Sequence, residues 1–309
     1  TGITYEYKNY DQKYFIPTFA GAPIGFREGS STLASRFNHA MNWGDEVGHQ
    51  IELNRAVGSL KWLGNLSFAY KHGKVKVGEI WNQYVEGNFT NATDSDIFHQ
   101  YPFRQMYSEL SGYTMNDKLY FKLGIDKYDE FKGYDNPEHI SAITFPSMFT
   151  YALSGGNSIT SYLERQSRTE LKYNSDLFIL ENWNFKNNYF SFTLNHAKGI
   201  SLSFFYDDET SDKITYETYN YDPNLDIEDT CIINSQAAGY LWNGSDCVQE
   251  KFDLYNNWIG YDLSYKINST SQFSIFYGSQ KGGLVCANGV CAEQPGFDDG
   301  VKVTFRTIF

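Results

Sequence analysis

Apolar and polar residues alternate along most of this chain. In "LKWLGNLSFAY" (60–70) most of the even-numbered positions are apolar, namely Leu60, Trp62, Leu66, Phe68 and Tyr70. The same period of two runs through "KLYFKLGID" (118–126), "YFSFTLN" (189–195) and "WIGYDLSYKI" (258–267). Because successive side chains of a strand point to opposite faces, this pattern predicts β-strands with one apolar and one polar face.

The composition also favours strands. The 309 residues include 25 Tyr and 24 Phe but only 7 Pro, and aromatic enrichment is typical of sheets. A chain of this length exceeds the usual domain size, but all-β barrels as long commonly form one domain. We therefore expect a single domain over residues 1–309.

The alternation divides the chain into about 14 segments. Several of them reach the ~9–11 residues that a tilted strand needs to cross a bilayer. The sequence contains no run of 18 apolar residues that could form a membrane-spanning helix. The expected strands lie near 2–10, 31–43, 46–57, 60–72, 104–114, 117–129, 139–153, 157–171, 175–185, 188–198, 200–209, 252–267, 270–280 and 299–309.

Two architectures accommodate so many alternating strands. A soluble β-sandwich or β-solenoid would pack the apolar faces inward. A closed transmembrane barrel would turn them to lipid, and closure would remove the unpaired edges of long strands. The second face is rich in Ser, Thr, Asn, Lys and Asp, which suits a barrel interior, but alternation alone leaves both architectures open.

The end of the chain favours the barrel. Val301, Val303, Phe305, Thr307 and Phe309 alternate with polar residues, apart from Ile308. This strand resembles the C-terminal strand of Gram-negative outer-membrane proteins, which ends in an aromatic residue. We expect an all-β fold, an antiparallel transmembrane β-barrel of about 14 strands, between about 12 and 16, with long extracellular loops. It would contact outer-membrane lipid.

A periplasmic C-terminus sets the sides of the loops. The turn at 268–270 would then be periplasmic, and the loops 281–298 and 210–251 extracellular. By this count the long loop 73–103 falls on the periplasmic side, whereas bacterial barrels have short periplasmic turns and long extracellular loops. Either one strand is miscounted or this loop breaks the rule.

A wider resemblance covers most of the chain. "DEVGHQIEL" (45–53) and "LGNLSFAY" (63–70), with the GGLVCxxGVC element and the terminal Phe of 273–309, are similar to an uncharacterised outer-membrane barrel family of Bacteroidota-type bacteria. The resemblance implies a barrel but no activity, cofactor or ligand. Longer N-terminal parts in that family imply that this chain is short at that end. Its start has no basic or apolar leader, so a signal peptide has been removed or was never there.

Four cysteines in an exported protein predict two disulfides. A two-residue turn at Asn288-Gly289 would place Cys286 directly opposite Cys291, with Cα atoms ~4.5 Å apart, which suits a disulfide. Cys231 and Cys247 would then pair by default. A four-cysteine zinc site is the alternative, but the spacings lack paired short knuckles. Free or redox-active thiols are a further alternative.

Other motifs for chemistry are weak. Asp222–Asp229 ("DPNLDIED") vaguely resembles a calcium loop, but Ile227 stands where such loops need Gly, so a solvated acidic loop is the simpler interpretation. The six histidines form no metalloprotease motif, and no nucleophile elbow occurs. We expect no catalytic residue, cofactor or metal, and no enzyme. The net charge of −12 argues against nucleic acid as a partner.

Two functions fit these features. The first is a porin-like channel for small polar solutes, lined by inward-facing Lys61, Lys118, Lys122, Lys266, Lys302 and Arg306. The second is a structural or partner-binding subunit of an outer-membrane or cell-surface complex, with a protein partner at the extracellular loops. An outer-membrane enzyme is a third alternative, which would need a His within hydrogen-bond reach of a Ser or Asp at the outer rim.

Overall fold

The computed structural model describes residues 1–10, 26, 31–37, 39, 46–70, 103–132, 138–174, 179–217, 240–242, 247–249, 252–287, 290–294 and 296–307. Its strands are β1 (Gly2–Tyr10), β2 (Glu46–Val57), β3 (Leu60–Tyr70), β4 (Phe103–Thr114), β5 (Leu119–Lys132), β6 (Glu138–Ala152), β7 (Ser158–Asn174), β8 (Ile179–His196), β9 (Ile200–Glu217), β10 (Tyr240–Trp242), β11 (Cys247–Gln249), β12 (Phe252–Lys266), β13 (Ser271–Gln280), β14 (Gly283–Ala287), β15 (Val290–Gln294) and β16 (Phe297–Thr307). Two 3₁₀ turns, η1 (Ala34–Arg36) and η3 (Ser154–Gly156), accompany them. No helix in the described part of the chain is long and apolar enough to span a membrane.

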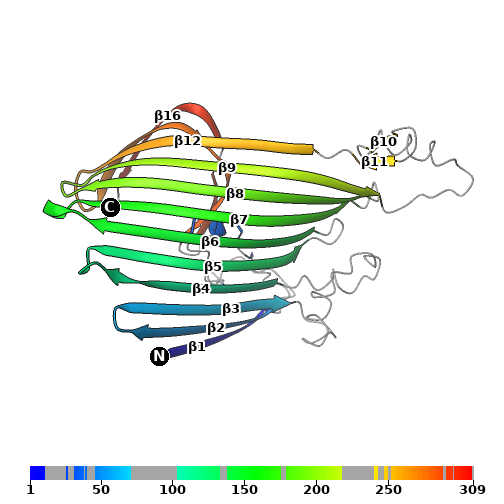
Figure 1. Cartoon of the computed structure of the whole chain (residues 1–309), viewed down its shortest axis with the longest axis horizontal. Coiled ribbons are helices and arrows are strands. Elements are labelled where there is room, and N and C mark those ends of the chain that lie inside the picture. Colours follow the sequence, from blue (N-terminus) through cyan, green and yellow to red (C-terminus); the bar gives the residue numbers. More distant parts are fainter. Residues whose placement is uncertain are drawn as a thin grey trace, which may run out of the picture.

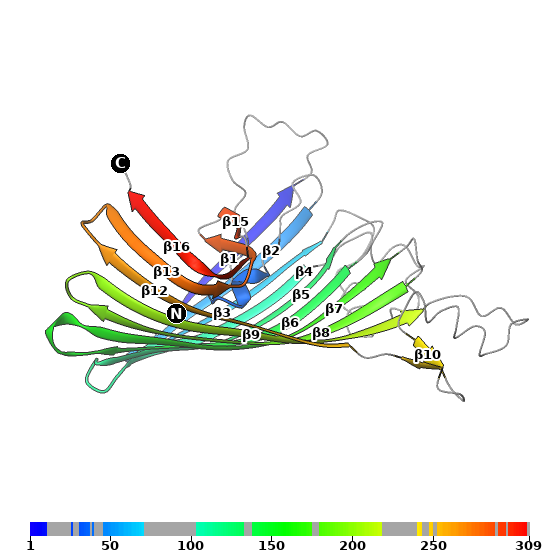
Figure 2. The same cartoon turned by 90° about the horizontal axis from the view of Figure 1, so that it is seen from above.

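Twelve of these strands form one antiparallel sheet, in the order β1-β2-β3-β4-β5-β6-β7-β8-β9-β12-β13-β16. They lie side by side in chain order (Figure 1) and curve into a trough (Figure 2). Within the described residues β1 pairs only with β2, and β16 only with β13, so the sheet is open between these two edges. The all-β antiparallel expectation is confirmed. Among the described residues the sheet has twelve strands, which is the lower end of the expected range of 12 to 16 and two fewer than the expected 14.

Two errors of segmentation account for the difference in strand number. Residues 179–196 form one strand, β8, where two were expected at 175–185 and 188–198. No strand lies in the described part of 31–43, which holds η1 instead. Strand β8 pairs without a break along β7, from Ser158↔Asn195 to Asn174↔Ile179. The expected break between these two segments, at residues 186–187, lies inside that ladder.

The corrected count also removes the conflict over the long loop 73–103. The two-residue connection of β2 to β3, and the short connections β4–β5, β6–β7, β8–β9 and β12–β13, all lie at one end of the sheet, at the left in Figure 1. We call this the turn end. The longer connections, including the one between β3 and β4, begin and end at the opposite end, which we call the loop end. The longest connections, β1–β2, β3–β4, β9–β12 and β13–β16, all lie at the loop end as expected. Two other loop-end connections, β5–β6 (133–137) and β7–β8 (175–178), are as short as those at the turn end.

The convex face of the sheet is apolar. Cross-strand partners share a face, and one row runs Trp62–Leu110–Leu123 over β3, β4 and β5. Exposed apolar residues continue this face as far as β16. Exposed aromatic residues mark both ends of it: Tyr7, Tyr255 and Tyr277 toward the loop end, and Trp62, Tyr265 and Phe305 toward the turn end.

The concave face is polar and, in its middle, buried. One continuous row of paired positions, which we call the polar row, crosses from β2 to β12: Glu52, Asn65, Tyr107, Asp126, Thr144, Gln166, Asn187, Glu209 and Asn256. Asn187 is 0% exposed and Gln166 is 1% exposed. Polar side chains of a sheet are buried to this extent only when something covers them, and their hydrogen-bonding groups then need partners.

Candidate functional site

A segment between β1 and β2 covers the buried polar side chains in the middle of the concave face. Its described residues are Phe26, 31–37 and His39, and we call them the inner segment. They lie inside the trough (Figure 2), where Leu33 is 0% exposed. The short turn η1 begins where the Ser31 hydroxyl oxygen accepts a hydrogen bond from the backbone N–H of Ala34, 3.2 Å away. A serine in this role is a common start signal for helical turns.

A carboxylate on β7 holds the middle of the inner segment. The two oxygens of Glu164 accept hydrogen bonds from the backbone N–H groups of Thr32, at 2.9 Å, and Leu33, at 2.8 Å. On the same strand the Gln166 amide donates to the Leu33 carbonyl oxygen, at 3.2 Å, and to the Thr144 hydroxyl oxygen, at 2.8 Å. Both polar groups of Leu33 therefore bond to the wall of the trough.

An aromatic residue anchors the start of the segment. The Phe26 ring sits on Gly48 of β2, where a Cβ atom would come within 2.5 Å of the ring. The ring also packs against Phe103, with centroids 5.2 Å apart, and the Lys8 ammonium lies 4.0 Å from its centroid. Gly48 thus provides the space that this anchor requires.

His39 fixes the far end of the segment between two strands. Its Nδ1 lies 2.6 Å from the Glu130 carboxylate on β5, and its Nε2 lies 3.0 Å from Glu46 on β2. The ring stacks on Phe103 at 4.2 Å. Burial lowers the pKa of His39, but the hydrogen bonds to Glu130 and Glu46 outweigh burial and raise it to about 8. The imidazolium form with both nitrogens donating suits this position.

Ion pairs tie the segment to the other half of the sheet. Arg36 of η1 donates to both carboxylate oxygens of Asp207 on β9. Arg168 of β7 lies between Phe37 of the inner segment and Phe185 of β8, 4.7 and 3.8 Å from the two ring centroids. The inner segment is therefore bonded to strands from β2 to β9.

The hairpin β14–β15 covers the inner segment from the other side. β14 contacts η1, and the hairpin lies inside the trough near β16 (Figure 2). Just before it, the Lys281 ammonium donates to Glu209, 2.6 Å away. Burial lowers the pKa of Lys281, and Glu209 opposes that shift. The hairpin thus adds a second element to the filled interior.

Four of the expected lumen-facing cations lie on the concave face near the turn end: Lys61, Lys122, Lys266 and Arg306. Lys302 is on the same face in the middle of β16, opposite Phe276, and Lys118 lies in the connection between β4 and β5. Lys266, Gln272 and Arg306 are register partners at the turn end, and Lys61 pairs with Ser111, which pairs with Lys122. Lys122 is engaged by Glu109 at 3.2 Å. The concave face also carries buried acidic residues, which the sequence analysis did not single out: Glu46, Glu109, Asp126, Glu130, Glu164 and Asp207.

The cysteine positions are partly described. In β14–β15 the register pairs Cys286 with Cys291 and Ala287 with Val290, as a two-residue turn requires. Cys247 begins β11, opposite Trp242. The side chains of these three cysteines, and all of Cys231, lie outside the described residues. The disulfides stay predictions, and so does the choice between a calcium loop and a solvated loop at Asp222–Asp229, which lies outside the description too.

Two further described histidines, His139 and His49, lie beside carboxylate or hydroxyl groups. His139 Nε2 lies 3.9 Å from Asp129 Oδ1, beyond hydrogen-bond reach, and Arg104 donates to the other oxygen of that carboxylate at 2.8 Å. His49 bonds to the Tyr5 hydroxyl on the convex face, opposite to the face of Glu52. Among the described residues, no three His, Cys, Asp or Glu side chains are grouped to hold a metal ion.

The chain has little similarity to known proteins. No family model and no curated protein matches the chain. Among solved structures it is similar to the alcaligin outer-membrane receptor FauA of Bordetella pertussis, at 10% sequence identity and a TM-score of 0.43. The likeness covers 79% of this chain and 42% of the receptor, so the chain spans less than half of the receptor's length. A likeness at this identity and score assigns no function to the chain.

Proposed function

We propose that this protein is an outer-membrane β-barrel whose polar interior, narrowed by the inner segment, is a porin-like channel for small polar solutes. The observation that carries the proposal is the separation of the two faces. An apolar convex band with aromatic residues at both ends suits lipid and its two interfaces. A polar concave face suits water and solute. Each of the twelve strands has at least the 9 residues of β1, which is long enough to cross a bilayer at a tilt.

The proposal includes closure between β1 and β16. Twelve is an even number, so these two edge strands run antiparallel and can pair directly. Both carry exposed apolar residues on the convex face, among them Ile3 and Val303. Unpaired strand edges are very costly in lipid, which supplies no hydrogen-bond partners.

A photo-reactive amino acid at Ile3, in protein folded in outer membranes, tests the closure. The expected product is an intramolecular link from β1 to the peptide 297–307, with the mobility of a monomer. A link to a second copy of the chain, or no link to β16, would contradict closure within one chain.

The orientation follows from the same model. The loop end would face the outside of the cell and the turn end the periplasm, so that the C-terminus is periplasmic. An epitope inserted at Gly155, in the short connection of β6 and β7, should be inaccessible to antibody on intact cells and accessible after the outer membrane is opened. Labelling on intact cells would reverse the orientation.

The channel itself is tested by conductance in planar bilayers. Purified, heat-modifiable protein should produce stable single-channel steps in salt, because a row of polar side chains crosses the concave face from β2 to β12. Membranes that stay silent at every protein concentration would contradict a channel. The second function would then be favoured.

The second candidate, a partner-binding subunit, rests on the hairpin β10–β11. This hairpin lies beyond the loop end of the sheet, away from the barrel wall (Figures 1 and 2). A protein partner retained through detergent purification, and lost when residues 240–249 are replaced by a short Gly/Ser linker, would support it. Retention of the partner by that variant would argue against this hairpin as the contact.

A further inference from the structure

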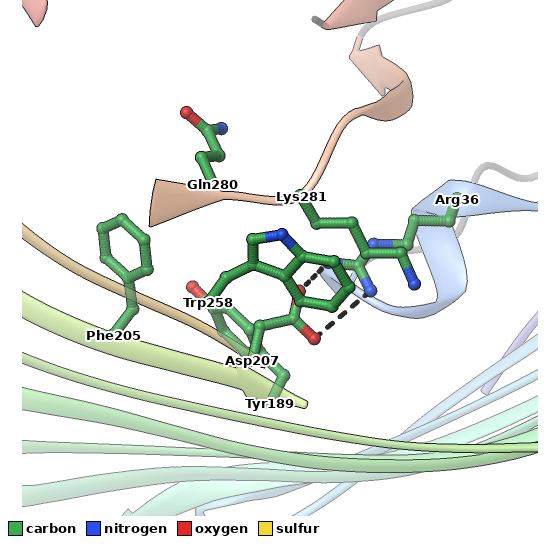
Figure 3. A pocket seen from close by; sticks show the side chains of 7 residues that line it. All are labelled: Arg36, Tyr189, Phe205, Asp207, Trp258, Gln280 and Lys281. Atoms are coloured by element: carbon green, nitrogen blue, oxygen red, sulfur yellow. Dashed lines mark hydrogen bonds and ion pairs between the residues drawn. The ribbon is translucent and has the colours of Figure 1, made fainter. Parts of the chain in front are cut away.

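A small cavity lies on the concave face, where the inner segment ends against the second half of the sheet. It measures about 90 Å³. We call it the aromatic cavity, and Figure 3 shows its lining residues: Arg36, Tyr189, Phe205, Asp207, Trp258, Gln280 and Lys281. At the other end of the inner segment, Phe26 packs with Phe103 and Tyr128 in a buried apolar cluster. A solute in the interior would therefore meet the inner segment on the side of the aromatic cavity.

The walls of the cavity are set by strand register. Tyr189, Asp207 and Trp258 are direct partners on β8, β9 and β12, so they form one row. Phe205 stands beside them over Gly260, where a Cβ atom would come within 2.4 Å of its ring. These positions are fixed by the sheet rather than by loops, which favours a preformed site.

The charges at the cavity compensate one another. Arg36 is paired with Asp207, and Lys281 is paired with Glu209 at 2.6 Å. The Lys281 ammonium also lies 5.1 Å from the Trp258 ring centroid. A charged ligand would have to separate one of these partly buried pairs, which is costly. The site therefore suits a ligand without net charge.

The remaining groups narrow the chemistry of the ligand. Three aromatic side chains offer flat faces, and the Gln280 amide makes no hydrogen bond to any residue that the structure describes. The paired guanidinium and carboxylate keep donor and acceptor capacity for hydroxyl groups. A purely apolar ligand would leave these polar groups unsatisfied. A pyranose ring presents C–H groups to aromatic faces and hydroxyls around its edge.

We propose that the aromatic cavity binds one pyranose unit of a neutral saccharide. Trp258 supplies the stacking face, and Gln280 and the Arg36–Asp207 pair bind hydroxyl groups. A role of this site in solute permeation rests on the proposed channel function. As a binding site it can be measured without any permeation.

Calorimetric titration of the detergent-folded protein tests the site. Glucose and N-acetylglucosamine are the neutral probes, gluconate is the anionic probe and glucosamine the cationic one. The neutral sugars should bind and the charged ones should bind more weakly. The variants Trp258→Leu and Gln280→Leu should each weaken glucose binding by about tenfold or more, the loss of a good contact. The matched variant Trp62→Leu, on the convex face, should bind as the unchanged protein does.

Each outcome has a defined meaning. Absence of glucose binding, tighter binding of gluconate than of glucose, or unchanged binding by Trp258→Leu would overturn the proposal, provided that the variants keep the heat-dependent gel mobility of a folded barrel. Glucose binding by a protein that does not conduct would keep the site and overturn the channel. Conductance without glucose binding would overturn the site alone.

Discussion

Single carboxylates decide where the inner segment lies. Glu164 is 4% exposed and accepts hydrogen bonds from two backbone N–H groups that are more than 130 residues away in the sequence. A charged acceptor of this kind is stronger than a neutral one. Nothing in the local pattern of "YLERQ" distinguishes Glu164 from a solvated lumen residue, because its partners come from another part of the chain. Sequence patterns therefore could not identify the buried carboxylates that bind the inner segment.

Replacing Glu164 by Gln should loosen the inner segment without unfolding the sheet. The amide oxygen can accept one of the two N–H groups, while the amide nitrogen faces the other as a second donor. The loss should be about 1–3 kcal/mol of local stability. Hydrogen exchange of residues 31–37 should accelerate, and exchange of β3 and β4 should not. The variant Glu138→Gln, in the wall near the loop end, is the matched control.

His39 should make the anchoring of the inner segment depend on pH. Its pKa is raised from 6.5 in the unfolded chain to about 8. The stabilisation is therefore complete below pH 6.5 and is lost as the pH rises through 8, with a difference of about 2 kcal/mol. Exchange protection of residues 31–37, corrected for the intrinsic rate, should fall between pH 6 and pH 9. Equal loss of protection in His39→Gln would show that another group is responsible.

At the scale of elements, alternation predicted most strands of the sheet to within a few residues, although β9 continues to Glu217, beyond the expected end at 209. The expected segments 2–10, 46–57 and 252–267 coincide with β1, β2 and β12 to within a residue. The failures are of two kinds. The expected break at residues 186–187 falls inside β8, where Asn187 is a buried member of the polar row. A strand was expected at 31–43, but the described residues there, 31–37 and 39, contain the turn η1 and no strand.

The assignment of faces predicts a difference between adjacent residues on β12. Leu263 is 46% exposed on the convex face, whereas Ser264 is on the concave face. Arg at position 263, between the bilayer midplane and the turn-end interface marked by Tyr265, should cost about 1–2 kcal/mol, and Arg at 264 much less. Urea unfolding in lipid vesicles measures both. Equal costs for the two substitutions would mean that the convex face is not in contact with lipid.

The hairpin β14–β15 carries the most local of the sequence predictions. The expected register is confirmed, with Cys286 opposite Cys291. If the predicted disulfides form, neither cysteine should be alkylated in the native, unreduced protein, and both should be alkylated after reduction. Mass spectrometry of the peptide 283–294 measures the alkylation of both cysteines directly. Labelling before reduction would show that the thiols are free.

At the scale of the whole molecule, the sequence predicted the antiparallel sheet and the division into a turn end and a loop end. It could not predict what fills the trough, because the inner segment and the hairpin β14–β15 are placed by contacts across the fold rather than by period. The aromatic cavity was missed for the same reason. Its row Tyr189–Asp207–Trp258 exists only through the registers of β8, β9 and β12.

The central claim is that a polar interior conducts and that the inner segment narrows it. Single-channel conductance of the unchanged protein and of Glu164→Gln, in the same bilayer and salt, tests both parts together. The account predicts discrete steps for the unchanged protein and larger or more variable steps for the variant, in which the segment is partly released. Steps of identical size and stability in the two proteins, or no steps in either, would contradict it.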